Sequence, residues 1–106
     1  MPEYVGGPGT GTLPDSSTRD EVERPRPFKV LLHNDDYTSM EFVVEILQSV
    51  FRKGHVEAVR IMLNVHHNGV GVAGVYSAQI AESKVHEVHS RAEDHGFPLR
   101  CSIEPA

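Results

Sequence analysis

The chain is 106 residues long, which is enough for one domain, and its single cysteine, Cys101, excludes an internal disulfide bond and a thiolate metal cluster. The net charge is −5, from 10 basic and 15 acidic side chains, and the basic residues form no run, which argues against a nucleic-acid partner because phosphate backbones bind clustered Lys and Arg. No segment has the roughly 20 apolar residues of a membrane span, and the N-terminus lacks the apolar core of a secretion signal, so we expect a cytoplasmic protein that binds no membrane.

Residues 1–27 differ in composition from the rest of the chain. They hold five of the seven prolines, four of the nine glycines and a single aromatic residue, Tyr4. Such a segment cannot bury enough apolar surface to offset the entropy that it would lose on ordering. We therefore expect a flexible N-terminal extension over residues 1–27 and a folded core over residues 28–106.

The core begins with Phe28–His33, an aliphatic run that predicts a strand. Residues 34–37 (Asn-Asp-Asp-Tyr) favour a turn, because Asn and Asp side chains bond to nearby backbone amides. Thr38, with Glu41 three residues later, has the pattern of a capping box and predicts that a helix starts at Ser39.

Two helices are predicted next, because apolar residues recur at helical spacing. Gly54 closes the first helix or lies just beyond it. The second helix covers His55 to His67, and Asn68-Gly69 is a strong stop signal. The apolar stripe of the first helix is Met40, Val43, Val44, Leu47 and Phe51, and that of the second includes Val56, Val59, Met62, Leu63 and His66.

A strand, a third helix and a last strand complete the prediction. Val70–Tyr76 alternates valines with small residues, which indicates a strand with close neighbours, and Ser77 is a plausible N-cap for the third helix. Gly96 fits the C-cap of that helix, Pro98 prevents its continuation, and Leu99–Glu104 alternates like a strand. The order strand, helix, helix, strand, helix, strand predicts an α+β sandwich in which helices cover a three-stranded sheet.

The turn after the first strand is the densest polar cluster of the core. Asn34, Asp35 and Asp36 precede a helix N-terminus, where they are either a binding site or ordinary turn and capping residues. His66 follows Met62 by four residues and shares its helix face. A lone histidine on an apolar stripe is more often a hydrogen-bonded core residue than a ligand, so both interpretations stay open.

Catalytic and metal chemistry has weaker support. His86 and His89 share a helix face, but two histidines without a third ligand are a weak zinc signal, and His66 and His67 point in different directions. Cys101 lies in a predicted alternating strand and fits a buried structural thiol. We therefore expect no metal site and no cofactor. A metal-dependent hydrolase and a bare interaction domain such as the C-terminal domain of the ribosomal stalk stay open as alternatives to a binding protein.

Three segments together resemble the bacterial ClpS adaptor family. The stretch VLLHNDDYTSMEFVVEIL (Val30–Leu47) closely resembles the family signature, and Ile61–Lys84 and His95–Glu104 match as well, so the likeness runs from about Phe28 to the end of the chain. The resemblance implies three antiparallel strands and three helices after a disordered arm. It also implies a monomeric adaptor that is not an enzyme. Such an adaptor binds the bulky N-terminal residue (Leu, Phe, Tyr or Trp) of N-degron proteins and delivers them to the ATPase ClpA, which feeds the ClpP peptidase.

The resemblance assigns roles to residues of the polar turn. By similarity, Asn34, Asp35 and His66 surround the α-ammonium group of the substrate, whose three N–H donors require acceptors. Asp36 adds negative potential or holds the turn, and Met40 acts as a gate against Ile and Val. The pocket for the first side chain is, by the same similarity, lined by Thr38, Met40, Val43, Met62, Val65 and Leu99.

A second surface is implied for docking to the N-terminal domain of ClpA. By resemblance it includes Tyr76, Gln79 and Lys84. Family members often carry Glu at the position of Gln79 and Phe at that of Tyr76, so docking here would depend on Lys84 and apolar contacts. The extension over residues 1–27 resembles the variable arm that engages the ATPase during hand-over.

Overall fold

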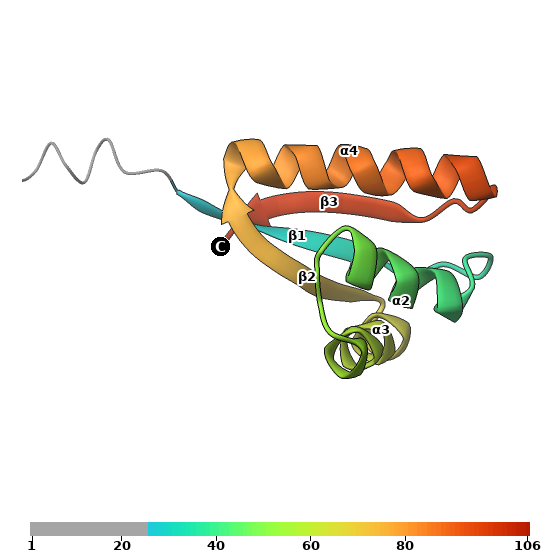
Figure 1. The fold of residues 1–106 in the computed structure, drawn as a ribbon. Coiled ribbons are helices and arrows are strands. Elements are labelled where there is room, and N and C mark those ends of the chain that lie inside the picture. Colours follow the sequence, from blue (N-terminus) through green and yellow to red (C-terminus); the bar gives the residue numbers. More distant parts are fainter. Residues whose placement is uncertain (1–25) are drawn as a thin grey trace, which may run out of the picture.

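The computed structural model describes residues 26–106 and contains three strands and three helices (Figure 1). In chain order these are β1 (Pro27–His33), α2 (Met40–Ser49), α3 (His55–Asn68), β2 (Val70–Ser77), α4 (Ala78–His95) and β3 (Arg100–Pro105). The order and the α+β class predicted from the sequence are confirmed. The predicted N-terminal extension lies outside the described residues except for Arg26 and Pro27, and Pro27 is already the first residue of β1.

The three strands form one antiparallel sheet with β1 in the centre, in the order β2-β1-β3. In the pairing of β1 with β2, Val30 faces Gly74 but Leu31 faces Val72, so the register shifts by one residue at this point. Such a shift leaves an extra residue on β2 and bends the strand. At the far end of β1, the backbone nitrogen of Ala106 donates to the carbonyl of Pro27 at 3.0 Å.

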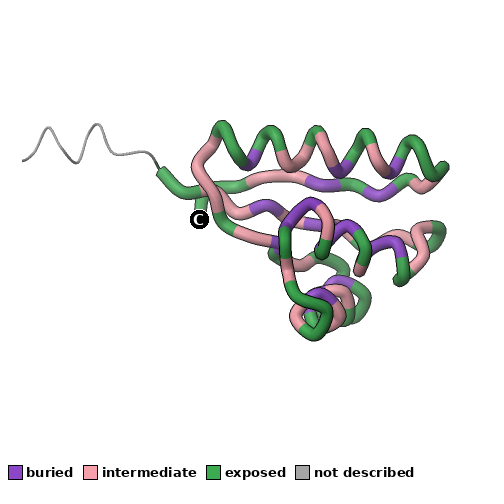
Figure 2. Tube along the Cα trace, in the orientation of Figure 1, coloured by how far each residue is buried: buried purple, intermediate pink, exposed green. Residues whose placement is uncertain are grey.

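The core lies between the sheet and the helices. Val30 and Leu32 are two residues apart and therefore point to the same face of the central strand. Both are fully buried, as are Leu47 of α2 and Val88 of α4. Figure 1 shows α4 running along β3, with α2 and α3 grouped near β2. The buried segments in Figure 2 accordingly lie on the inward sides of the strands and helices. Cys101 belongs to this core, and its burial raises the pKa of the thiol to about 12, as expected for a structural cysteine.

The start of α2 differs from the prediction. The N-cap is Ser39, whose hydroxyl accepts a hydrogen bond from the backbone nitrogen of Phe42 at 3.1 Å, so Thr38 does not cap the helix and Met40 is its first residue. Thr38 is instead bonded to Asp35 through its hydroxyl. Because two hydroxyl residues are adjacent, local sequence alone does not decide which of them caps.

The termini of α3 and α4 lie at three glycines and at Ser77. Gly54 is the N-cap of α3 rather than the end of α2, which stops at Ser49. Gly69 and Gly96 end α3 and α4 with φ angles of 87° and 76°, a left-handed conformation that glycine adopts at little cost. Ser77 caps α4, as predicted.

Candidate functional site

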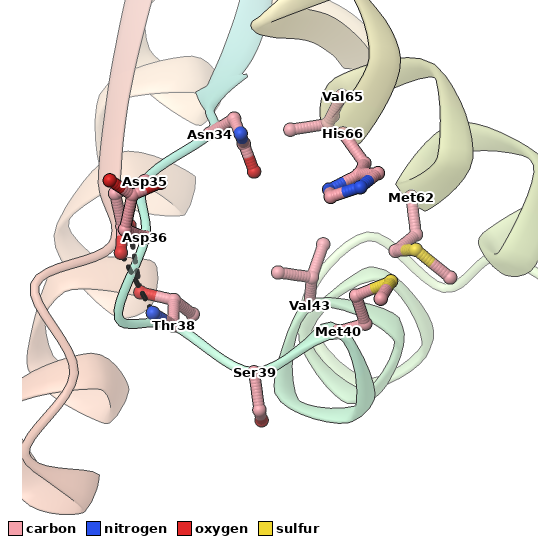
Figure 3. Close-up of a pocket in the computed structure, with 10 residues that line it drawn as sticks. All are labelled: Asn34, Asp35, Asp36, Thr38, Ser39, Met40, Val43, Met62, Val65 and His66. Carbon is pink, nitrogen blue, oxygen red and sulfur yellow. Dashed lines mark hydrogen bonds between the residues drawn. The ribbon is translucent and has the colours of Figure 1, made fainter.

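A cavity of about 280 Å³ lies between the loop after β1, the first turns of α2 and the last turns of α3 (Figure 3). We call it the inner cavity. It is lined by Asn34, Asp35, Asp36, Thr38, Ser39, Met40, Val43, Met62, Val65 and His66.

Nine of these ten lining residues are candidates from the sequence. The tenth, Ser39, was predicted only as the position where a helix starts. Leu99, the remaining candidate, is 3% exposed and belongs to the hydrophobic core, and it is not one of the lining residues. The fold therefore brings a loop and two helices together around one cavity.

Backbone pairing fixes the position of the loop. The backbone nitrogen of Asn34 donates to the carbonyl of Gly69 at 2.9 Å, which ties the end of β1 to the turn after α3. Met62, Val65 and His66 follow one another at intervals of three and one along α3, so they lie on the same side of that helix. The hydrogen bond therefore holds Asn34 beside the turn that ends the helix carrying His66.

The Asp35 carboxylate organises the loop from within. Its Oδ1 accepts hydrogen bonds from the backbone nitrogens of Tyr37 at 2.8 Å and Thr38 at 2.7 Å, and its Oδ2 accepts one from the Thr38 hydroxyl at 2.8 Å (Figure 3). Partial burial raises the pKa of this carboxyl, but the hydrogen bonds from Thr38 and Tyr37 together outweigh that effect, and the net pKa lies below its ordinary value. The loop thus carries a fixed negative charge beside the cavity.

The remaining side chains divide the inner cavity into a polar and an apolar part. Figure 3 shows the side chains of Asn34 and His66 pointing into the cavity from opposite sides. Val43 of α2 and Val65 of α3, which are 7% and 2% exposed, form a buried part of the wall, and the two methionines lie beyond them. This arrangement provides hydrogen-bond acceptors for a cationic group and an apolar enclosure for the side chain attached to it.

The three residues expected at the docking surface lie around the junction of β2 and α4. The Lys84 ammonium donates to the carbonyl of Val50 at 2.7 Å and lies 5.6 Å from the centre of the Tyr76 ring. Gln79 is exposed near the start of α4. Lys84 is therefore part of the contact between α4 and the end of α2, in addition to any role that it has in docking.

One histidine of the pair considered for metal binding, His89, makes a structural hydrogen bond. Nε2 of His89 accepts a hydrogen bond from the backbone nitrogen of Cys101 at 3.1 Å, which holds α4 against β3. Within residues 26–106, no group of three or more His, Cys, Asp and Glu side chains is placed to hold a metal ion. In the same part of the chain, no helix has the length and apolar character needed to span a membrane.

Comparison with known proteins identifies the family. The family model described as ATP-dependent Clp protease adaptor protein ClpS matches residues 23–102. A protein named ATP-dependent Clp protease adapter protein ClpS from Desulfatibacillum aliphaticivorans is 68% identical over 85 residues, which are 80% of this chain and 82% of that protein. The protein of the same name from Myxococcus xanthus (strain DK1622) is 49% identical over 96 residues, 91% of this chain and 90% of that protein.

A solved structure agrees with these matches. The structure of Agrobacterium tumefaciens ClpS2 bound to L-phenylalaninamide has 41% sequence identity to this chain and a TM-score of 0.76, and the match covers 78% of this chain and all of that one. The resemblance noted in the sequence is thereby confirmed. The chain belongs to the ClpS family of ATP-dependent Clp protease adaptor proteins.

Proposed function

We propose that this chain is a cytoplasmic, non-catalytic adaptor that binds the free, bulky N-terminal residue (Leu, Phe, Tyr or Trp) of N-degron proteins and delivers them to the ATPase ClpA of the ClpAP protease. The observation that carries the proposal is the inner cavity, in which acceptors and an apolar wall converge. A related protein has been solved with L-phenylalaninamide, a compound with a free α-amine and an aromatic side chain, which such a cavity suits.

The polar part of the cavity is suited to an α-ammonium group. Asn34 offers an amide oxygen and the His66 ring offers a nitrogen lone pair, so two of the three ammonium N–H groups have acceptors that point into the cavity. Asp35 supplies negative charge from the loop, although its hydrogen bonds within residues 26–106 are to the loop itself. Asp36 adds a second acidic group to the lining.

The apolar part is suited to the first side chain of the substrate. Val43 and Val65 provide rigid, buried surface, and Met40 and Met62 provide adaptable surface. Full burial of a Leu or Phe side chain contributes roughly 1.5–3 kcal/mol. Leu99 shares the core cluster of Val43 and Val65, so we assign it a supporting role behind the wall.

Delivery requires a second surface. We assign docking of the N-terminal domain of ClpA to Tyr76, Gln79 and Lys84, and the later hand-over to residues 1–27. Gln79 is exposed and lies near the start of α4, where it is available to a partner. The adaptor acts as a monomer in this proposal, with one inner cavity and one docking surface in each chain.

Peptide titration tests the proposal directly. A peptide that begins with Phe is compared with its N-acetylated form and with a peptide that begins with Gly, all otherwise identical. We expect only the free Phe peptide to bind tightly, because acetylation removes the charged ammonium and Gly leaves the apolar wall uncovered. Equal affinity for the free and acetylated Phe peptides would rule the proposal out.

A further inference from the structure

A second cavity lies against the inner one, between α2 and α3. It is an open depression of about 380 Å³, and we call it the outer cavity. It is lined by Met40, Glu41, Val44, His55 and Met62. Two of these residues, Met40 of α2 and Met62 of α3, also line the inner cavity. One methionine from each helix therefore stands between the two spaces.

The methionines are the movable part of the wall. Figure 3 shows their thioether ends on the side of the inner cavity away from Asn34, toward the cleft between the helices. Met40 is 47% exposed and Met62 is partly buried, and empty space lies behind both, so their ends can move without displacing a packed neighbour. An unbranched thioether chain has three rotatable bonds and adapts readily.

The two valines that line the inner cavity, in contrast to the methionines, form a rigid part of its wall. Val43 and Val65 are buried in the core, and a β-branched side chain has few alternative rotamers. The inner cavity consequently has one fixed wall and one yielding wall. The two methionines are therefore the part of the apolar wall that can yield to a larger guest.

We infer that the outer cavity is the space into which Met40 and Met62 retreat when a large aromatic side chain enters the inner cavity. Val44 and His55, which line only the outer cavity, then set the largest N-terminal residue that the adaptor accepts. This inference rests on the proposed function. A Leu side chain is held without the movement, whereas the indole of Trp requires it.

The positions of Val44 and His55 explain how they act. Val44 follows Met40 by four residues on α2 and so lies one turn further along the same side of the helix. His55 is the first residue of α3, two turns before Met62. Both line the same cavity as the two methionines, so a larger side chain at either position would occupy space needed for their retreat.

Two substitutions that fill the outer cavity test the inference. Val44→Phe fills it from α2 and His55→Trp fills it from α3, and neither residue lines the inner cavity. Val56→Phe is the matched control, because Val56 is 81% exposed and lines neither cavity. Affinities of the full chain are measured for two peptides that differ only in their first residue, Leu or Trp, and thermal unfolding by circular dichroism verifies that each variant folds.

We expect both filling variants to lose about tenfold or more in affinity for the Trp peptide, equivalent to about 1.4 kcal/mol, while affinity for the Leu peptide changes by less than about twofold. Val56→Phe leaves both affinities unchanged. A folded filling variant that keeps the wild-type ratio of Trp to Leu affinity, whether or not both affinities fall, would overturn the inference. Wild-type protein that binds the Leu peptide but not the Trp peptide would also overturn it, whereas wild-type protein that binds neither would overturn the proposed function itself.

Discussion

Gly71 of β2 lies directly against Val65 of α3. A Cβ atom at position 71 would come within 2.7 Å of Cγ2 of Val65 and 3.5 Å of its backbone nitrogen, so the absence of a side chain on the strand allows the helix to approach. Val65 faces the inner cavity on its other side. The width of that cavity therefore depends on a glycine that does not line it.

Gly71→Ala is expected to push Val65 toward the cavity. Overpacking of this kind typically lowers the free energy of unfolding by roughly 1–3 kcal/mol. We also expect a several-fold loss of affinity for a Phe-led peptide. Chemical denaturation and peptide titration measure the two effects. Gly54→Ala is the control for affinity, because a Cβ there has no neighbour within 4 Å, although the weaker N-cap of α3 lowers stability somewhat. An alanine at position 71 that lowered neither quantity would show that α3 moves freely away from the strand.

Asp35→Asn is expected to remove an acid-dependent contribution to stability. Partial burial raises the pKa of Asp35, but the hydrogen bonds from Thr38 and Tyr37 outweigh it, so the pKa in the folded protein lies below its ordinary value. A carboxyl group with a lowered folded pKa contributes stability that is present above its unfolded pKa and lost as the pH falls through its folded pKa. Urea unfolding between pH 7 and pH 3 should show wild type more stable than the variant at neutral pH, with the difference shrinking below about pH 3.8. A difference that stays constant down to pH 3 would contradict this assignment.

Loss of the acceptor at His66 is expected to weaken peptide binding. His66→Leu removes the ring lone pair that we assign to the substrate ammonium and leaves the Asn34 amide oxygen as the remaining acceptor that points into the cavity. Titrations of a Phe-led peptide at pH 7 should show a several-fold loss of affinity in His66→Leu and a smaller loss in His66→Gln, because the Gln oxygen accepts a hydrogen bond. His67→Leu, at the neighbouring position, should keep the wild-type affinity. Unchanged affinity in His66→Leu would assign the acceptor role to another group.

Lys84→Met is expected to affect folding as well as docking. The substitution removes the hydrogen bond from the ammonium to the carbonyl of Val50 and leaves an apolar chain beside Tyr76. A hydrogen bond from a charged group contributes about 1.5–3 kcal/mol, and we expect the free energy of unfolding to fall by an amount toward the lower end because the site is only partly buried. Gln79→Ala should change binding to the ATPase domain without changing stability, since Gln79 is exposed. Equal stability of wild type and Lys84→Met would leave Lys84 with a docking role alone.

The positions of the helices and strands could be predicted from the sequence because their signals are local. Ser77, Gly69 and Gly96 act through their own backbone and neighbouring residues, and each marks a helix end as predicted. The cap of α2 was assigned wrongly to Thr38, because Ser39 and Thr38 both carry hydroxyl groups. Asp35 decides between them by accepting the Thr38 hydroxyl, and that contact exists only once the loop has formed.

The candidate site, like the fold, could be predicted only in part from the sequence. The residue types of the site, acceptors near Asn34 and apolar residues along two helices, are visible in the sequence. The packing of α3 on β2, which Gly71 permits, brings His66 to the same cavity as Asn34. Leu99 is buried in the core and does not line that cavity. The empty space behind Met40 and Met62 is likewise a product of helix packing, because a cavity is defined by side chains that are distant in sequence and has no local signal.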